Sequence, residues 1–304
     1  MARTSPLPSL TDAIARAPGT EPVAVIAAED GVWLAETLAH HLRLGFAAVI
    51  VLCPPFLDDA CAALTEALGP DAGRVRCIPF DVRACPGGAA GAERLLTEAA
   101  LGARTGRWVY LGVNAEFLFF PFCEGRRIGD LTTFLGEERR DAAAGVIVDI
   151  FPATLAEVPP ASPAARPLWF DALGYVEAAR RDPAAGWAVR DRESEIFGGL
   201  RRRFEGHIPH SRRSIARMPL FRALPDVGLD PEGRFDSAEM NTRHCAWHRN
   251  PTVAVASLRA AKALRANPDS RAVISGLLWP GARPFDWSAQ TLVAAGLMEP
   301  GQWL

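Results

Sequence analysis

The feature that most constrains this chain is the alternation of short apolar runs with longer amphipathic stretches between residues 21 and 152. The apolar runs are rich in β-branched residues and have the length of buried strands, whereas leucines recur every four residues in the stretch 32–44, as on one face of a helix. The pattern predicts strands at 22–28, 47–53, 74–80, 107–113 and 145–151, and helices at 32–44, 57–68, 92–101 and 131–140. Strands that alternate with helices pair in parallel through right-handed crossovers. We therefore predict an α/β fold with a mixed, mostly parallel sheet and helices on both of its faces.

Polar residues follow two of the predicted strands. Glu29 and Asp30 come directly after the first strand, and Asn114 and Glu116 come after the fourth. Open α/β sheets bind their ligands outside the carboxyl ends of strands, so these side chains are candidates for a ligand site. Structural roles are the alternatives: Asp30 as the N-cap of the next helix, Asn114 as a turn cap, and Glu116 as a solvent-facing carboxylate.

Asp149 interrupts the apolar run of the fifth predicted strand. A charge inside a buried strand requires a partner. We therefore expect either a catalytic role for Asp149 or a structural salt bridge between Asp149 and an arginine.

A basic cluster follows the dipeptide at 198–199. Its members are Arg201, Arg202, Arg203, His207, His210, Arg212, Arg213 and Arg217. Because a guanidinium group binds diphosphate in a bidentate manner, we expect Arg201 and Arg203 to bind a diphosphate or an acceptor. Peripheral contact with anionic lipid or a plain solvated face are the alternatives.

The rest of the chain defines three segments. Residues 1–20 are predicted to be an N-terminal arm with a short helix at 10–15, 21–152 an α/β half, and 153–304 a second half. The second half opens with an irregular Ala/Pro-rich excursion over 153–186. Further along we predict a strand at 214–223 and helices at 252–266 and 286–295.

Several function classes are excluded or disfavoured by what the sequence lacks. The net charge of −2 gives no basic field for nucleic acid. No Gly-x-Gly-x-x-Gly follows the first predicted strand, and Lys262 is the only lysine, so a phosphate-binding loop of either common kind is not expected. Gly-x-Ser-x-Gly is also absent, which leaves a hydrolase nucleophile elbow unsupported.

The compartment is predicted from cysteines and apolar runs. Six cysteines are scattered without a Cys-x-x-Cys pair, so we expect reduced thiols rather than zinc or disulfide sites. The first residues lack the apolar core of a signal peptide, and no apolar run approaches the ~20 residues of a membrane span. Together these features predict a cytoplasmic protein with no transmembrane segment.

Several blocks of residues carry a resemblance to a known family. They are Glu116-Phe117-Leu118, Cys123-Glu124, Arg127, Asp130-Leu131 and Val148-Asp149, with Glu29, Leu34, Glu36, His40-His41 and Leu44-Gly45-Phe46 before them and 299–303 at the end. The chain resembles the GT-A glycosyltransferases of family 2, in particular a bacterial branch with the signature Asp-x-Asp-Glu-Phe-(Leu/Ile). The resemblance implies transfer of a sugar, as by a hexosyltransferase, from a nucleoside diphosphate-sugar to a glycan, lipid-linked or protein acceptor. It also implies a role in polysaccharide biosynthesis.

The resemblance further implies a divalent cation, and here the chain departs from the pattern. Val113-Asn114-Ala115-Glu116 aligns with Asp-x-Asp-Glu, so both metal-binding aspartates are missing. Asn114 and Glu116 remain as oxygen ligands, and we expect Mn²⁺ or Mg²⁺ to bind weakly without nucleotide. His244 and His248, four residues apart, are candidates for a two-histidine site or for the single late-chain histidine ligand of GT-A enzymes, although Trp247 and Pro251 favour a loop. A non-catalytic nucleotide- or glycan-binding protein and an assembly module are the alternatives to an enzyme.

Overall fold

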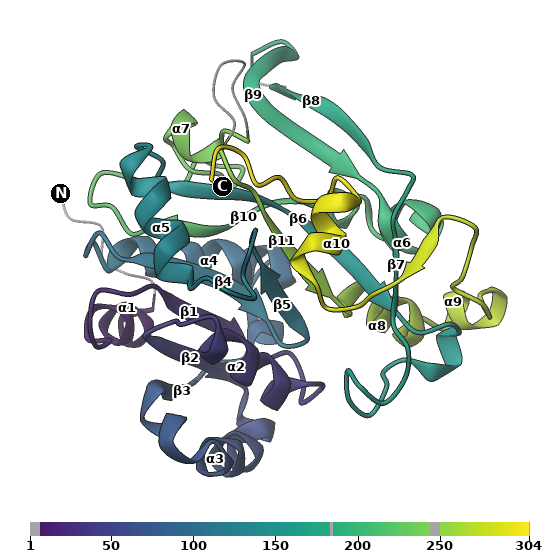
Figure 1. The fold of residues 1–304 in the computed structure, drawn as a ribbon, viewed down its shortest axis with the longest axis horizontal. Helices are drawn as coiled ribbons and strands as arrows, with labels where there is room; N and C mark the ends of the chain where they lie inside the picture. Colours follow the sequence, from purple (N-terminus) through teal and green to yellow (C-terminus); the bar gives the residue numbers. More distant parts are fainter. Residues whose placement is uncertain (1–6, 183–184, 244–249, 304) are drawn as a thin grey trace. The chain divides into compact units, whose positions relative to one another are not determined.

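The protein is described by a computed structural model that covers residues 7–182, 185–243 and 250–303 (Figure 1). The chain forms two compact units. Unit 1 comprises Met1–Asn114, Arg126–Ala143 and Pro219–Asn241, and unit 2 comprises Ala115–Gly125, Ala144–Met218 and Thr242–Leu304. Each unit draws on both sides of residue 152, and the linear segment boundaries expected from the sequence stay a prediction.

The sheet of unit 1 confirms the first four predicted strands and their parallel pairing. Its strands are β1 (Val23–Ala27), β2 (Ala48–Cys53), β3 (Val75–Pro79) and β4 (Trp108–Val113). They pair in parallel in the order β3-β2-β1-β4, with Val23 opposite Ala48 on one side and Val109 on the other. Residues 220–222 of β10 (Ala216–Arg222) lie antiparallel to β4. β1 and β2 are buried throughout, as their apolar, β-branched sequences require.

Helices flank these strands. In unit 1 they are α1 (Pro8–Ala15), α2 (Leu34–Arg43), α3 (Asp58–Ala67), α4 (Gly88–Gly102), α5 (Ile128–Glu137) and α7 (Ala238–Asn241), with short 3₁₀ turns η1 (Pro55–Leu57), η2 (Gly69–Arg74) and η3 (Val82–Ala84). Helix α5 begins three residues before its predicted start. Asp130 therefore lies inside its first turn, where its carboxylate accepts a hydrogen bond from the backbone N–H of Arg127 at 2.7 Å.

Unit 2 contains a mixed sheet and a hairpin. The sheet strands are β5 (Glu116–Phe119), β6 (Ala142–Phe151, within the unit from residue 144), β7 (Trp169–Asp171), β11 (Val253–Ser257) and β12 (Ala282–Pro284). β6 and β11 are parallel, and the other pairs are antiparallel. β8 (Val176–Asp182) and β9 (Ala188–Phe197) form the hairpin (Figure 1). The helices are α6 (Gly199–Arg203), α8 (Arg259–Ala266), α9 (Pro268–Val273) and α10 (Ala289–Ala294), and the 3₁₀ turns are η4 (Leu155–Glu157), η5 (Glu205–His207) and η6 (His210–Arg212).

Two predictions for unit 2 are wrong in part. The predicted helix 252–266 is a helix only from Arg259; its first third is strand β11, buried between β5 and β6. An alternating Val-Ala run is compatible with a helix or with a strand. It forms a strand here because it is buried between β5 and β6. The excursion 153–186 is not irregular throughout, because it contains η4, β7 and the whole of β8. The strand predicted at 214–223 is confirmed as β10.

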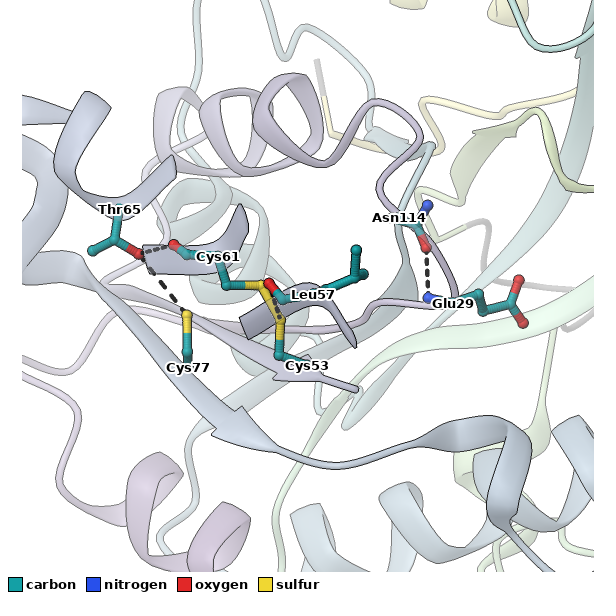
Figure 2. The surroundings of a disulfide bond; sticks show 7 residues. All are labelled: Glu29, Cys53, Leu57, Cys61, Thr65, Cys77 and Asn114. Atoms are coloured by element: carbon teal, nitrogen blue, oxygen red, sulfur yellow. Dashed lines mark hydrogen bonds between the residues drawn. A yellow bond between two sulfur atoms is a disulfide. The ribbon is translucent and has the colours of Figure 1, made fainter. Parts of the chain in front are cut away.

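Cysteine pairing also differs from expectation. Cys53, at the end of β2, and Cys61, in α3, form a disulfide (Figure 2). The prediction of reduced thiols is therefore wrong for this pair, while Cys77, Cys85 and Cys123 are free cysteines. Burial raises the pKa of the Cys123 thiol to about 11, which keeps that thiol protonated and unreactive.

Among the residues that the structure describes, none of the helices is both long and apolar enough to cross a bilayer.

Candidate functional site

The strand order of unit 1 identifies one place where a ligand site is expected. From β1 the chain moves to β2 and β3 on one side, and β4 then lies on the other side of β1. This reversal makes a switch point between β1 and β4, where open α/β sheets bind ligands outside the carboxyl ends of the strands. Glu29 and Asp30 follow β1 there, and Asn114 follows β4.

Asn114 ties the two strand ends together. Its side chain is 1% exposed, and its Oδ1 accepts a hydrogen bond from the backbone N–H of Glu29 at 2.8 Å. Its Nδ2 donates to Asp30 Oδ1 at 2.6 Å and to the carbonyl oxygen of Val32 at 2.9 Å. The amide thus fixes the loop 29–32 against the end of β4. This is more than the turn cap considered from the sequence, because the partners lie more than 80 residues away.

The two acidic residues of this loop remain accessible. Glu29 and Asp30 are half-exposed, and Figure 2 shows the Glu29 carboxylate pointing away from Asn114. Asp30 is not the N-cap of α2, since Trp33 holds that position; Asp30 Oδ1 instead accepts a hydrogen bond from the N–H of Val32 at 2.9 Å. The loop 29–32 therefore carries two partly exposed carboxylates, and hydrogen bonds hold its backbone in place.

An aromatic residue and an arginine lie after the neighbouring strands. Phe56, in η1 after β2, is 54% exposed, and the Arg83 guanidinium in η3 lies 4.2 Å from the centre of its ring. Hydrogen bonding to Asp81 raises the pKa of Arg83, and the charge of Asp30 acts in the same direction. A Cβ on Gly31 would contact the Leu57 side chain at 3.7 Å, so the loop 29–32 and the turn that carries Phe56 are adjacent. The sequence analysis missed both Phe56 and Arg83, although each follows a predicted strand.

The carboxylates of unit 2 are placed differently. Glu116, at the start of β5, is fully buried; Arg217 Nη1 donates to its Oε2 at 2.9 Å, and the Ser257 hydroxyl donates to its Oε1 at 3.3 Å. The alternative of a solvent-facing Glu116 is therefore wrong. A buried carboxylate held by a guanidinium and a hydroxyl has its hydrogen-bonding needs met within the protein.

Asp149 forms a salt bridge with an arginine, which is one of the two roles considered from the sequence. Its side chain is fully enclosed, and Arg201 Nε donates to its Oδ1 at 3.1 Å. Burial raises the pKa of Asp149, and the charge of Arg201 opposes that shift. A Cβ on Gly199, where φ is +63°, would lie 3.0 Å from Asp149 Oδ2, so a glycine at this position permits the close approach. The catalytic role of Asp149 stays a prediction.

A second buried pair lies in the same unit. Arg203 Nε donates to Asp171 Oδ2 at 2.7 Å, the Trp279 indole donates to Asp171 Oδ1 at 2.6 Å, and the Tyr175 hydroxyl donates to the Asp171 backbone oxygen at 2.7 Å. Burial raises the pKa of Asp171 and raises that of Tyr175 well above its usual value. Arg201 and Arg203 are thus held in ion pairs, and their role in diphosphate binding stays a prediction. The sequence analysis missed Asp171 and Tyr175, which lie in the segment predicted to be irregular, and Trp279, which lies between two predicted helices.

The two oxygen ligands predicted for a cation, Asn114 and Glu116, both form hydrogen bonds within the protein. Both oxygens of Glu116 have partners, and the positive charge of Arg217 beside them opposes a cation. The Asn114 amide is neutral and bonded to the loop 29–32. Nowhere in the described chain do three or more His, Cys, Asp or Glu side chains gather as a metal would require. His244 and His248 lie outside the described residues, so their role stays a prediction.

Comparisons with known proteins leave the family unassigned. No known protein family matches the chain, and no curated protein is similar to it in sequence. Among solved structures, the crystal structure of apo-UDP-glucose pyrophosphorylase is similar with a TM-score of 0.32 and 9% sequence identity, over 83% of this chain and 100% of that chain. The likeness is weak. The α/β architecture is established by the strand pairing described above.

Proposed function

We propose that this protein binds a nucleoside diphosphate-sugar at the switch point of unit 1 and transfers the sugar to a glycan, lipid-linked or protein acceptor. The observation that carries the proposal is the cross-link by Asn114, which holds the loop 29–32 on β4 and presents Glu29 and Asp30 at the carboxyl ends of β1 and β4. A position of this kind is where α/β sheets read nucleotides. The resemblance to GT-A glycosyltransferases of family 2 supplies the reaction.

Recognition of the nucleoside follows from the chemistry of the loop. A carboxylate accepts hydrogen bonds from the two hydroxyls of a ribose or from the N–H groups of a base, and charged acceptors make the stronger hydrogen bonds. Phe56 offers an exposed ring on which a base can stack, and the Arg83 guanidinium beside the ring is paired with Asp81. The absence of a glycine-rich phosphate loop is consistent with a site that recognises the nucleoside rather than enclosing the phosphates.

Calorimetry with uridine diphosphate and guanosine diphosphate, each with and without Mn²⁺, tests this proposal. We expect one nucleotide to bind the parent protein and to bind Glu29→Gln about tenfold more weakly, because the variant loses a charged acceptor. Glu66→Gln, an exposed change on α3 in the same unit, serves as the matched control and should bind like the parent. If neither nucleotide gives heat under any condition, the proposal fails and an assembly module becomes the better explanation.

A second candidate is a protein that binds the nucleotide-sugar without turnover. The observation that favours it is the engagement of both remaining positions of the metal motif: the Asn114 amide in the loop cross-link and the Glu116 carboxylate in its ion pair. Hydrolysis of UDP-glucose, with and without Mn²⁺, separates the candidates. Release of glucose above the rate without protein supports an enzyme, whereas binding without release supports the second candidate.

A further inference from the structure

Two loops of unit 2 form an exposed apolar surface that plays no part in the nucleotide proposal. We define the Trp279 patch as Leu173, Gly174, Leu278, Trp279 and the adjacent Arg202. Leu173 is 58% exposed and Leu278 is 46% exposed, while Trp279 is half-buried. The backbone N–H of Ala172 donates to the carbonyl oxygen of Gly281 at 3.0 Å, which holds the two loops side by side. The members of the patch therefore lie on neighbouring loops at the adjoining ends of β7 and β12, with Arg202 beside them.

The indole of Trp279 is fixed in orientation. Its N–H donates to the buried carboxylate of Asp171 at 2.6 Å, and the Arg203 guanidinium lies 5.5 Å from the centre of the ring. A Cβ on Gly281 would lie 2.3 Å from the ring, so only a glycine fits behind it. A ring held in this way loses little conformational freedom when a ligand stacks on it, which favours binding.

A positive charge stands at the edge of the ring. Arg202 is exposed, and its Nη1 donates to the carbonyl oxygen of Gly174 at 2.7 Å. A Cβ on Gly174 would lie 3.4 Å from Trp279 Cη2, so the backbone that anchors Arg202 adjoins the indole. Arg203, in contrast, is already paired with Asp171. The patch thus combines a rigid aromatic ring, two exposed leucines and an exposed guanidinium.

We propose that the Trp279 patch binds an anionic oligosaccharide, as the acceptor or as part of it; the term acceptor rests on the proposed function. The C–H groups on one face of a pyranose ring carry partial positive charge and stack on the negative face of an indole. A carboxylate on the sugar would pair with Arg202. A membrane surface is the less favourable occupant, because the indole N–H that would face lipid headgroups is instead bonded to Asp171 inside the protein.

Saturation-transfer NMR with trigalacturonate and with the neutral trisaccharide maltotriose tests the proposal. The parent should bind trigalacturonate more tightly than maltotriose. Trp279→Ala should weaken both at least tenfold, Leu278→Ala should weaken both a few-fold, and Arg202→Gln should weaken trigalacturonate only. The matched control is Trp187→Ala, which removes an exposed tryptophan (63% exposed) on the hairpin of the same unit and should leave both affinities unchanged.

Leu278→Ala keeps the test decisive if Trp279→Ala fails to fold, because Leu278 is exposed. No saturation transfer to either trisaccharide at millimolar concentration overturns the inference, and so does an equal loss in Trp187→Ala. Binding to phosphatidylglycerol vesicles that depends on Trp279, without saccharide binding, overturns it in favour of a membrane. Titration of uridine and guanosine diphosphate into the same proteins separates the two proposals. If the parent binds neither nucleotide the proposed function fails, whereas loss of saccharide binding alone contradicts only the patch.

Discussion

The two units hold their acidic residues in opposite ways. In unit 1, Glu29 and Asp30 are half-exposed on a loop that a neutral amide fixes through its backbone. In unit 2, Glu116, Asp149 and Asp171 are buried, and each forms an ion pair with an arginine. Burying a charged carboxylate without a partner costs free energy. The carboxylates of unit 2 can therefore stay ionised only because each is paired with an arginine. Of these carboxylates, the partly exposed ones, Glu29 and Asp30, are those at the switch point of unit 1.

The comparison also separates two uses of arginine. The sequence places Arg201, Arg202 and Arg203 in one run, but the structure gives them different environments: Arg201 and Arg203 are paired with buried carboxylates, and Arg202 is exposed. Adjacent basic residues thus do not form one phosphate-binding cluster by default. Four substitutions test the difference between the two units.

Replacing one partner of a buried ion pair should lower the free energy of unfolding more than any of the other substitutions. Asp149→Asn leaves the Arg201 guanidinium buried without a counter-charge, and we expect the free energy of unfolding to fall by about 3–5 kcal/mol. Urea denaturation measures the change. Asp12→Asn is the matched control, because Asp12 pairs with Arg16 on the surface, where the side chains are 62% and 75% exposed, and its loss should cost under about 1 kcal/mol. Equal effects of the two substitutions would contradict the structural role of Asp149.

Removing the disulfide between Cys53 and Cys61 should cause the second-largest loss in the free energy of unfolding. Cys53→Ser opens a link across a sequence separation of 8 residues, and chain entropy gives a loss of about 2–3 kcal/mol in the free energy of unfolding. Thermal melting with and without dithiothreitol checks the result: the reductant should lower the melting temperature of the parent and leave Cys53→Ser unchanged. Cys77→Ser, at an exposed free cysteine, should respond to the reductant like the parent. A parent insensitive to reductant would show that the link adds no stability.

Restoring an acidic residue to the altered metal motif should make the protein's stability depend on a divalent cation. Asn114→Asp replaces the amide donor that lies 2.6 Å from Asp30 Oδ1 with a carboxylate, so two negative groups would face one another. We expect a loss of about 1–3 kcal/mol in unfolding free energy without metal, from the broken hydrogen bonds. Added Mn²⁺ should recover much of it, because a charged oxygen pair suits a hard cation. Melting temperatures measured over a Mn²⁺ series test this: a flat response like that of the parent would show that the switch point cannot hold a cation.

The smallest effect on stability is expected at Glu29. Glu29→Gln removes a half-exposed charge and should change the free energy of unfolding by no more than about 0.5 kcal/mol. The same substitution should weaken nucleotide binding about tenfold, which corresponds to about 1.4 kcal/mol. A denaturation curve measured beside the binding isotherm checks both values. Destabilisation as large as that of Asp149→Asn would give Glu29 a structural role and remove the contrast between the units.

The fold of unit 1 is readable from the sequence because its parallel strands are continuous apolar runs separated by amphipathic helices. β11 was not readable, since its Val-Ala alternation becomes a strand only through burial between β5 and β6. The positions of Glu29 and Asn114 followed from strand ends. The partner of Glu116 did not, because Arg217 lies 101 residues further along the chain and several arginines were equally available. Contacts between residues so far apart in the chain depend on how the elements pack, so the sequence around either residue does not reveal them.

The most direct test of nucleotide binding at the switch point is hydrogen–deuterium exchange with and without a saturating nucleoside diphosphate. Binding between β1 and β4 should slow exchange of the backbone amides in the loop 29–32 and at Asn114, and should leave the amides of 171–175 and 199–203 unchanged. Protection of 199–203 with no change in the loop 29–32 would contradict the assignment, because the ligand would then bind the arginine-rich segment of unit 2.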